Sequence, residues 1–232
     1  MSEIQDQASV QHVDSAIASR HSMRQFLPKP VPREMVAKLL ELGARAPSGT
    51  NVQPWKVYAL AGDAKAALSA AIMKKFDNGE KESREYDYYP KVWEEPWLSR
   101  RRKVGKGLYS VLGIPKEDKE GMQRQTSRNI LFFDAPVGLI ITMDRCFGHG
   151  MFMDIGLFMG NIMTSARARG LDTCPQAFFA DYPATIRACL GIGENEIIVC
   201  GIALGYADQT APVNTLVTDR EPVEGFAEFR GF

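Results

Sequence analysis

Two arginines flank a histidine and a serine in the segment RHSMR, residues 20–24. Guanidinium groups and hydroxyl donors bind phosphate well, so these residue types could form an anion site. Taken by itself, the segment fits equally well as a helix surface on which Arg20 and Arg24 pair with solvent-facing carboxylates. The choice between the two depends on the other polar segments of the chain.

The loop APSGTN, residues 46–51, combines backbone freedom with short polar groups. Pro47 ends a predicted helix, and Gly49 allows another group to approach the backbone closely. The side chains that could make hydrogen bonds there are Ser48, Thr50 and Asn51. Alone, such a loop is more simply a surface turn, and only its combination with other motifs favours a binding role.

Cysteine and histidine positions argue against several other kinds of site. The four cysteines are far apart without a CxxC pair, so we expect neither a zinc knuckle nor a dithiol centre. Cys174 has no histidine or carboxylate beside it, and we expect a small buried side chain there and not a nucleophile. With no HExxH motif, we predict no metal site. The glycines at 191–196 lack the spacing of a dinucleotide-binding turn.

The composition is that of one globular domain. Of the 232 residues, 45% are hydrophobic and 24% charged, enough to bury one large core. Its 28 basic residues balance 28 acidic ones, so we expect no binding to nucleic acid or to an anionic membrane. The first ten residues do not resemble a secretion signal, and no apolar stretch reaches the roughly 18 residues of a spanning helix. We therefore expect a cytoplasmic protein.

Apolar patterns predict a succession of helices and strands. Nearly continuous apolar runs at 135–143 and 196–207 predict strands covered on both faces, and a shorter run at 56–60 predicts a third. Amphipathic helices are predicted at 32–46, about 63–75, about 151–169 and 184–192, and one further helix leads into residue 20. This order is compatible with an α+β or an α/β architecture.

Three segments depart from this pattern within one predicted domain, residues 1–232. Residues 1–12 are polar, and we expect them to be disordered. Residues 76–128 mix tyrosines and tryptophans with basic residues and interrupt the core pattern as an insertion. The tail at 208–232 carries three phenylalanines at every third position, too apolar for a free end. We expect this tail to pack on a second subunit.

Four motifs follow one another along the chain: RHSMR, APSGTNVQPW, LDTCPQ and TDREPVEGFAEF. Together they resemble the FMN-dependent nitroreductase family, and only residues 76–128 match it weakly. The resemblance implies an α+β fold with a central, mostly antiparallel sheet flanked by helices. It also implies a domain-swapped homodimer whose C-terminal extensions wrap the partner and whose two FMN molecules lie at the subunit interface.

The resemblance assigns the two ends of the cofactor to arginines. Arg20, Ser22 and Arg220 match the residues that hold the FMN phosphate. Arg24 matches a basic residue that stabilises the negative charge of the reduced flavin near N1 and the C2 carbonyl. The expected cofactor-binding residues are Arg20, His21, Ser22, Arg24, Pro47, Ser48, Gly49, Asn51, Gln125, Ser127, Pro175, Gln176, Ala177 and Arg220.

Three further segments complete this expected site. The loop at 46–51 matches contacts to the flavin that is bound mainly by the other subunit. The backbone N–H of either Gln176 or Ala177 matches the donor to flavin N5. Gln125 and Ser127 correspond to polar contacts at the pyrimidine edge, although a helix end facing solvent explains them equally well.

The implied activity is that of an NAD(P)H-dependent flavoenzyme. NADPH or NADH would reduce FMN, and a nitroaromatic or quinone acceptor would then take the electrons in the same pocket, in a ping-pong mechanism. Because the flavin carries the chemistry, we expect no catalytic acid, base or nucleophile from the chain. The expected partners are a second copy of the chain and a small aromatic electron acceptor.

Two alternatives stay open. The first is a reductive dehalogenase similar to iodotyrosine deiodinase, whose inserted lid carries glutamate, tyrosine and lysine. The corresponding residues of the insertion here are Glu85, Tyr86, Tyr89 and Lys91, and the last three are candidate substrate contacts. The same aromatic residues could simply pack the insertion against the core. The second alternative is a flavin-binding protein without turnover.

Overall fold

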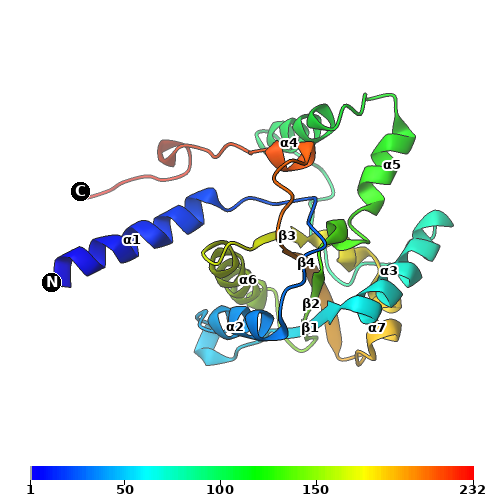
Figure 1. Ribbon diagram of the computed structural model, residues 1–232, viewed down its shortest axis with the longest axis horizontal. Helices are drawn as coiled ribbons and strands as arrows, with labels where there is room; N and C mark the ends of the chain where they lie inside the picture. The colour runs from blue at the N-terminus through cyan, green and yellow to red at the C-terminus, as the bar shows by residue number, and fades with distance from the viewer. Residues whose placement is uncertain (1) are drawn as a thin grey trace.

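The two longest apolar runs form the central strands of a four-stranded sheet in the computed structural model, which describes residues 2–232 (Figure 1). β2 spans Val137–Asp144 and β4 spans Glu196–Gly205, and nearly every residue of both is buried. At the edges, β1 (Lys56–Ala61) pairs with β2, and β3 (Asp172–Gln176) pairs with β4. All three pairs are antiparallel, which confirms the α+β class and the antiparallel sheet.

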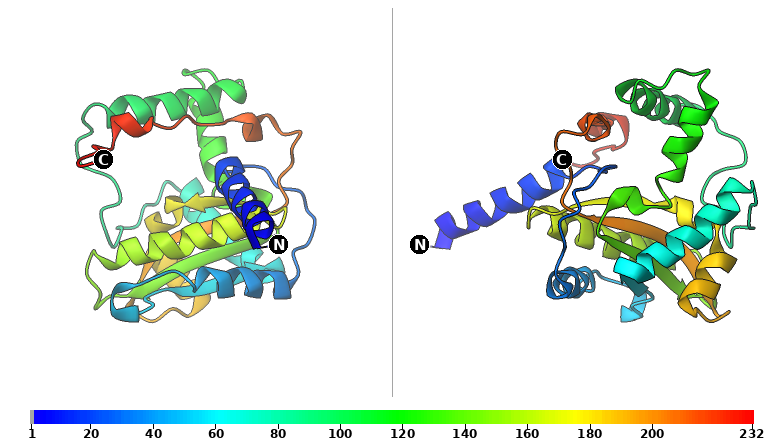
Figure 2. Two further views of the ribbon diagram at one scale, coloured as in Figure 1. Left: turned by 90° about the vertical axis from the view of Figure 1, so that its left-hand side faces the viewer. Right: turned by 45° about the vertical axis from the view of Figure 1, so that its right-hand side comes forward.

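Helices cover both faces of the sheet (Figure 2). One face carries α2 (Arg33–Gly43) and α6 (Met151–Arg167). The other carries α3 (Gly62–Asp77) and α7 (Pro183–Leu190). The short 3₁₀ turns η1 to η5 span Gly49–Asn51, Phe132–Asp134, Ala177–Asp181, Pro212–Thr215 and Val223–Gly225.

Alternate residues of β2 enter the two cores. Leu139 and Ile141 belong to the cluster formed with α2 and α6. Ile140 belongs to the opposite cluster, with Leu68 and Ile72 of α3. A strand covered on both faces has no solvent-facing positions, which explains its continuous apolar sequence. Each fully buried aliphatic side chain stabilises the fold by about 1.5–3 kcal/mol relative to exposure.

The contact between α2 and α6 is close because α2 contributes a glycine. A Cβ atom at Gly43 would lie 2.6 Å from Cγ1 of Ile162 and 3.0 Å from Cε2 of Phe158. On the same side, the Trp55 ring stacks on Phe158 at a centroid distance of 4.8 Å. This packing holds the loop between α2 and β1 beside α6.

The N-terminal segment is helical, whereas we expected residues 1–12 to be disordered. α1 spans Ser2–Ser19 and extends away from the sheet, on the left in Figure 1; Met1 lies outside the described residues. Val10, Val13 and Ile17 share one face of α1 at helical spacing, and each is more than half exposed. The helix expected to lead into residue 20 is thus confirmed, but it begins at Ser2, earlier than expected, because three apolar positions in a polar stretch give too weak a pattern to mark its start.

The insertion at 76–128 forms two further helices, α4 (Trp97–Val111) and α5 (Lys119–Ser127), which stand off the sheet at the top of Figure 1. The C-terminal segment returns to them. Ion pairs join Arg100 to Glu221 at 2.8 Å and Lys103 to Asp219 at 2.5 Å. The insertion and the tail thus contact each other within one chain. None of the described helices has the length and apolar character needed to cross a bilayer.

Candidate functional site

The RHSMR segment lies between β3 and the C-terminal segment. Ser22 forms a bridge with Thr173 of β3, and the Met23 N–H donates to the Thr173 carbonyl at 3.1 Å. Met23 is buried and anchors the segment in the core, whereas Arg24 is half-buried. The Arg24 guanidinium donates to the Ser22 carbonyl at 3.2 Å. The segment is therefore extended beside a strand and is not the helix surface that was its alternative.

Asn214 of η4 holds the other side of this segment. Its Oδ1 accepts from the Arg24 N–H at 2.6 Å, and its Nδ2 donates to the Gln25 carbonyl at 2.8 Å. The Asn214 carbonyl lies 3.3 Å from Nε2 of His21. The two ends of the chain thus meet at Asn214. Sequence reasoning missed this residue, because a lone asparagine in a segment without periodicity gives no signal.

A cavity of about 260 Å³ opens beside Arg24 at the end of β3. The core contributes Arg24, Asn129, Phe133, Cys174, Pro175, Gln176, Ala177 and Phe178 to its wall, and the insertion contributes Tyr89, Leu108, Tyr109, Gln125 and Thr126. Five of the expected cofactor-binding residues are thereby brought together. They are Arg24, Gln125, Pro175, Gln176 and Ala177.

Two buried oxygens of β3 have no hydrogen-bond donor among the described residues. They are Oγ1 of Thr173 and Oε1 of Gln176. Gln176 uses only its amide nitrogen, which donates to the carbonyl and side-chain oxygens of Asn129 at 2.9 and 3.2 Å. Buried polar groups are normally paired, and Gln176 lines the cavity whereas Thr173 does not, so the Gln176 oxygen is suited to a bound molecule that donates a hydrogen bond. Neither Thr173 nor Asn129 was among the expected site residues.

A second cavity, of about 590 Å³, adjoins the first. Pro175, Gln176 and Ala177 line both, so the end of β3 separates them. The second cavity is otherwise mostly apolar, with Phe152 and Met159 of α6 and Cys200 of β4 in its wall. Burial raises the pKa of the Cys200 thiol to about 12, which leaves it unreactive at neutral pH.

Cys174 also has the buried environment expected from the sequence. Only 3% of the residue is exposed. Burial raises the pKa of its thiol, so the nucleophilic thiolate is disfavoured. Among the described residues, no group of three or more His, Cys, Asp or Glu side chains could hold a metal ion.

The loop at 47–51 lies apart from the cavity beside Arg24. Gly49–Asn51 of this loop form η1, and the Gly49 N–H donates to Oδ2 of Asp154 on α6 at 3.1 Å. Ser48 accepts from the Gln53 N–H at 3.0 Å through its hydroxyl. None of the expected loop residues Pro47, Ser48, Gly49 and Asn51 lines the cavity. Within one chain, the two halves of the expected site are therefore separate.

Ser127, Arg20 and Arg220 are also outside the cavity wall. The Ser127 hydroxyl donates to the Arg124 carbonyl at 2.9 Å, and Ser127 lines a different hollow from Gln125. Arg220 is exposed and donates to the carbonyl and hydroxyl of Thr218 at 3.0 and 2.8 Å. Its neighbours Asp219 and Glu221 pair with α4, which holds this part of the tail against the insertion.

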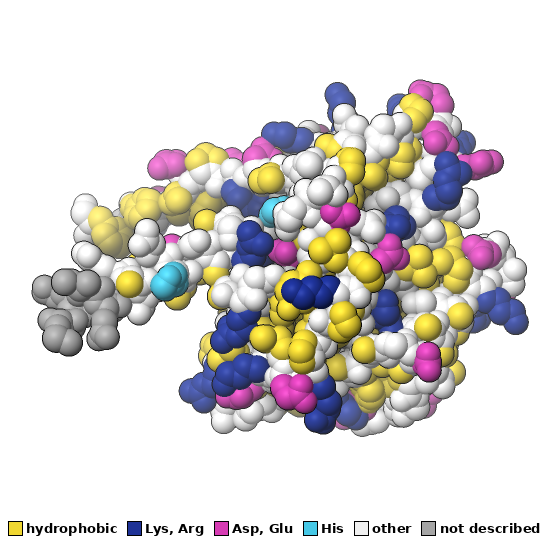
Figure 3. All heavy atoms as spheres, in the orientation of Figure 1, with side chains coloured by type: hydrophobic (Ala, Val, Ile, Leu, Met, Phe, Trp, Pro, Cys, Tyr) yellow, Lys and Arg dark blue, Asp and Glu magenta, His cyan; other side chains and the backbone are white. Residues whose placement is uncertain are grey.

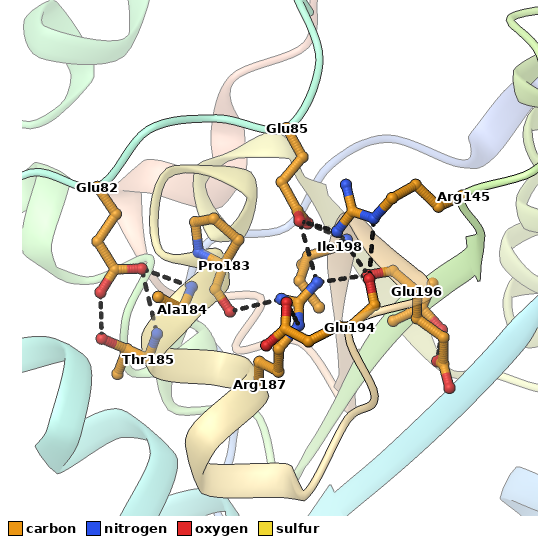
Figure 4. A network of polar contacts seen from close by, with 11 residues as sticks. Glu82, Glu85, Arg145, Pro183, Ala184, Thr185, Arg187, Glu194, Glu196 and Ile198 are labelled. Carbon is orange, nitrogen blue, oxygen red and sulfur yellow. Dashed lines mark hydrogen bonds and ion pairs between the residues drawn. The ribbon is translucent and has the colours of Figure 1, made fainter.

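The base of the insertion is fixed to the core by carboxylates (Figure 4). Glu85 accepts from Arg187 at 3.0 Å and from the Ile198 N–H at 2.8 Å, and it also pairs with Arg145. Glu82 accepts from the first N–H groups of α7, at Ala184 and Thr185. The glutamate that a dehalogenase-like lid would offer to a substrate is thus fully engaged within the chain.

The three candidate substrate contacts of the insertion have different surroundings. The Tyr86 hydroxyl donates to the Val199 carbonyl, and its ring packs on Phe152 at 4.7 Å. Burial raises the pKa of Tyr86. Tyr89 is about half exposed and lines the cavity beside Arg24, whereas Lys91 is exposed and lines neither cavity. Only Tyr89 can face a molecule bound next to Arg24.

Comparisons with known proteins agree with this arrangement. The family model described as "Nitroreductase family" matches residues 17–206. The chain is 42% identical to a 4-nitrobenzoate reductase of Nocardioides sp. (strain LMS-CY), over 95% of this chain and 91% of that protein. It superposes on the FMN and NADPH-dependent nitroreductase NfnB of Sphigopyxis sp. strain HMH with a TM-score of 0.92 and 37% identity, covering 95% and 99% of the two chains.

A second solved structure has nearly the same fold. The FMN-dependent nitroreductase NfnB of Mycobacterium smegmatis, in complex with NADPH, gives a TM-score of 0.91 at 29% identity, covering 95% of this chain and 99% of that one. Because the family model covers most of the chain and the relatives match it nearly end to end, the protein belongs to the nitroreductase family.

Proposed function

We propose that the protein is an FMN-dependent NAD(P)H oxidoreductase that reduces nitroaromatic or quinone acceptors. The cavity at the end of β3 carries this proposal, because it joins a cation, carboxamides and the unpaired buried oxygen of Gln176 in one wall. The relatives support it, since they are named as nitroreductases that use FMN and NADPH or act on 4-nitrobenzoate. We assign the reaction to the cytoplasm, where reduced nicotinamide is regenerated.

The residues of the cavity fit the polar edge of a flavin. The isoalloxazine ring has both acceptors and an N–H donor, which suit the Arg24 guanidinium and the free Gln176 oxygen. Either the Gln176 or the Ala177 N–H would donate to N5. Arg20, Ser22 and Arg220 would hold the phosphate. When bound, FMN would pass electrons from the nicotinamide to the acceptor.

The chain itself would supply binding and electrostatic stabilisation. Arg24 places positive charge where reduction adds negative charge to the cofactor. Tyr89 and Tyr109 of the insertion would cover the bound molecules and exclude water. Cys174 is not suited to covalent chemistry because burial raises its thiol pKa. No side chain of the cavity wall therefore needs to act as a nucleophile.

A homodimer would complete the site. The loop at 47–51 lies outside the cavity of its own chain and would contact the flavin of the partner. Large apolar side chains are exposed on the projecting ends of the chain and on α6, where a partner would cover them (Figure 3). They are Val10, Val13 and Ile17 of α1, Met153 and Leu157 of α6, and Phe226, Phe229 and Phe232 of the tail.

The dehalogenase alternative has lost its main support. Glu85 is held by two arginines and a backbone N–H, Tyr86 by a backbone carbonyl, and Lys91 lies outside both cavities. Of that set, Tyr89 lines the cavity beside Arg24, and Tyr86 lines the second cavity. The residues of the insertion therefore favour a structural role for its base and a covering role for its outer part.

Anaerobic stopped-flow absorbance tests this function. NADPH or NADH should bleach the flavin bands of the FMN-loaded protein, and subsequent mixing with 4-nitrobenzoate or a benzoquinone should restore them. A protein that binds FMN but is bleached by neither nucleotide would instead be a flavin-binding protein without turnover. Rapid turnover of a halotyrosine, with no turnover of a nitroaromatic, would reinstate the dehalogenase.

A further inference from the structure

Asn214 is buried and uses every hydrogen-bonding group it has. Only 6% of the residue is exposed. Its Oδ1 accepts from the Arg24 N–H at 2.6 Å, and its Nδ2 donates to the carbonyls of Gln25 and Asp208 at 2.8 and 2.9 Å. Its own N–H donates to the Ala211 carbonyl at 3.0 Å. The carboxamide therefore joins the RHSMR segment to the C-terminal segment, 190 residues away.

Only a carboxamide can make this set of contacts. The Arg24 N–H needs an acceptor, whereas the Gln25 and Asp208 carbonyls each take a second donor beside a backbone N–H. Asparagine presents one acceptor and two donors from a short side chain. A carboxylate would face two carbonyl oxygens without a proton. An apolar side chain would leave the Arg24 N–H without its acceptor, and the Gln25 and Asp208 carbonyls would keep only their backbone donors, the Asp208 and Ala211 N–H groups.

The backbone of the segment is held from both sides. On one side, Ser22 and Met23 pair with Thr173 of β3. On the other, Asn214 holds the backbone of Arg24 and Gln25. Arg24, whose backbone is fixed in this way, lines the cavity together with Gln176. Asn214 itself does not line the cavity.

We infer that Asn214 is a positioning residue of the cofactor site, which sets the place of the Arg24 guanidinium by fixing its backbone. The inference rests on the proposed function, in which Arg24 faces the flavin. Positive charge at that place stabilises the reduced cofactor more than the oxidised one, because reduction adds negative charge. Loss of the Asn214 carboxamide should therefore weaken FMN binding and also lower its midpoint potential.

The test compares wild type, Asn214→Ala and Asn214→Ser, with Asn195→Ala as the control. Asn195 is exposed and donates to Oδ2 of Asp144, far from β3 along the sheet. FMN affinity is measured by quenching of flavin fluorescence, and the potential by titration against a reference dye. A third measurement follows amide hydrogen exchange of residues 20–26 in the protein without FMN.

We expect N214A to bind oxidised FMN about tenfold more weakly than wild type does. Its affinity for reduced FMN should fall by a further factor of about ten. The second factor lowers the potential by about 30 mV for a two-electron couple. N214S, which keeps a short donor and acceptor, should fall between N214A and wild type and serves if N214A does not fold. Exchange at 20–26 should be faster in both variants, and N195A should match wild type throughout.

Each other result has a definite meaning. Wild-type affinity and potential in N214A and N214S would overturn the inference while leaving the proposed function intact. Weaker binding at an unchanged potential would also overturn it, because Asn214 would then only maintain the fold. If wild type itself binds no FMN, the proposed function fails. Separately, unchanged amide hydrogen exchange of residues 20–26 in the variants would overturn the positioning role.

Discussion

Gln176 faces Asn129 with its amide nitrogen, at 2.9 Å from the Asn129 carbonyl and 3.2 Å from its Oδ1. Because both partners are acceptors, the Gln176 carboxamide has one orientation, which leaves Oε1 buried without a donor. An unpaired buried group of this kind costs about 1–3 kcal/mol. A bound molecule with an N–H group would recover that free energy, so Gln176 favours such a ligand.

Replacing Gln176 by glutamate should impair cofactor binding. The carboxylate cannot donate to Asn129 and would place negative charge beside the acceptor oxygens and the flavin. We expect Q176E to bind FMN at least about tenfold more weakly, in keeping with the cost of unpaired buried charged groups. Fluorescence titration measures the effect, and Gln123→Glu on the exposed side of α5 is the control. Equal affinities of Q176E and Q123E would contradict this role of Gln176.

The Glu85 network should hold the base of the insertion. Glu85→Ala leaves the largely buried Arg187 with only the exposed Glu194, at 3.5 Å, as a carboxylate partner, which should lower the free energy of unfolding by about 3 kcal/mol. Limited proteolysis should also cut the following segment, 87–96, faster. Glu80→Ala breaks a more exposed pair with Lys75 and should cost less than about 1 kcal/mol. Urea unfolding measures both free energies. If the two variants lose similar amounts of unfolding free energy, the network does not anchor the insertion.

Glu196 should contribute to the loss of stability in acid. Burial alone would raise the pKa of this carboxyl, but hydrogen bonds from Lys56, Thr142 and Tyr58 outweigh burial and hold the pKa below its ordinary value of 4.5. A lowered carboxyl pKa stabilises the fold above pH 4.5, and this stabilisation is lost as pH falls through the lower, folded-state pKa. Glu196→Gln should therefore show a shallower decline in Tm below pH 4.5 than wild type.

Thermal unfolding between neutral pH and about pH 3 measures that difference in slope. Glu224→Gln removes an exposed carboxyl of the tail and serves as the control, with the wild-type slope expected. A decline in E196Q as steep as in wild type would mean that other carboxyls account for the acid sensitivity.

Complementation between two variants tests whether the loop at 47–51 serves the partner's site. Arg24→Met should disable the site of its own chain, and Ser48→Trp should block the site of its partner. A mixed dimer of the two would carry one intact site, so random reassociation should restore about a quarter of the wild-type sites. Nitroaromatic turnover after mixing measures this recovery. No recovery, with mixed dimers demonstrated by native mass spectrometry, would show that the loop and Arg24 serve the same chain's site.

Local patterns predicted the elements whose burial is complete. The runs that became β2 and β4 are apolar because both faces are covered, and α6 has a broad apolar stripe. β3 was not predicted as a strand, because Asp172–Gln176 is mostly polar and contains a proline. Its conformation comes from pairing with β4, a tertiary contact that propensity does not reveal.

For the candidate site too, the sequence predicted some residues and missed others. Family resemblance named Arg24, Gln125 and the end of β3 as expected cofactor contacts, and the fold brings these residues into one cavity wall. It did not identify Asn214 or Asp154, whose partners lie 190 and 105 residues away. Roles of this kind depend on long-range contacts and carry no local signal.

Titration of the cofactor-free protein with FMN tests the central claim most directly. The account predicts saturable quenching of flavin fluorescence at one FMN per chain, with affinity at least about tenfold weaker in Arg24→Met, since a charged hydrogen-bond partner is removed. Absence of quenching at saturating protein, or equal affinity in wild type and R24M, would contradict it.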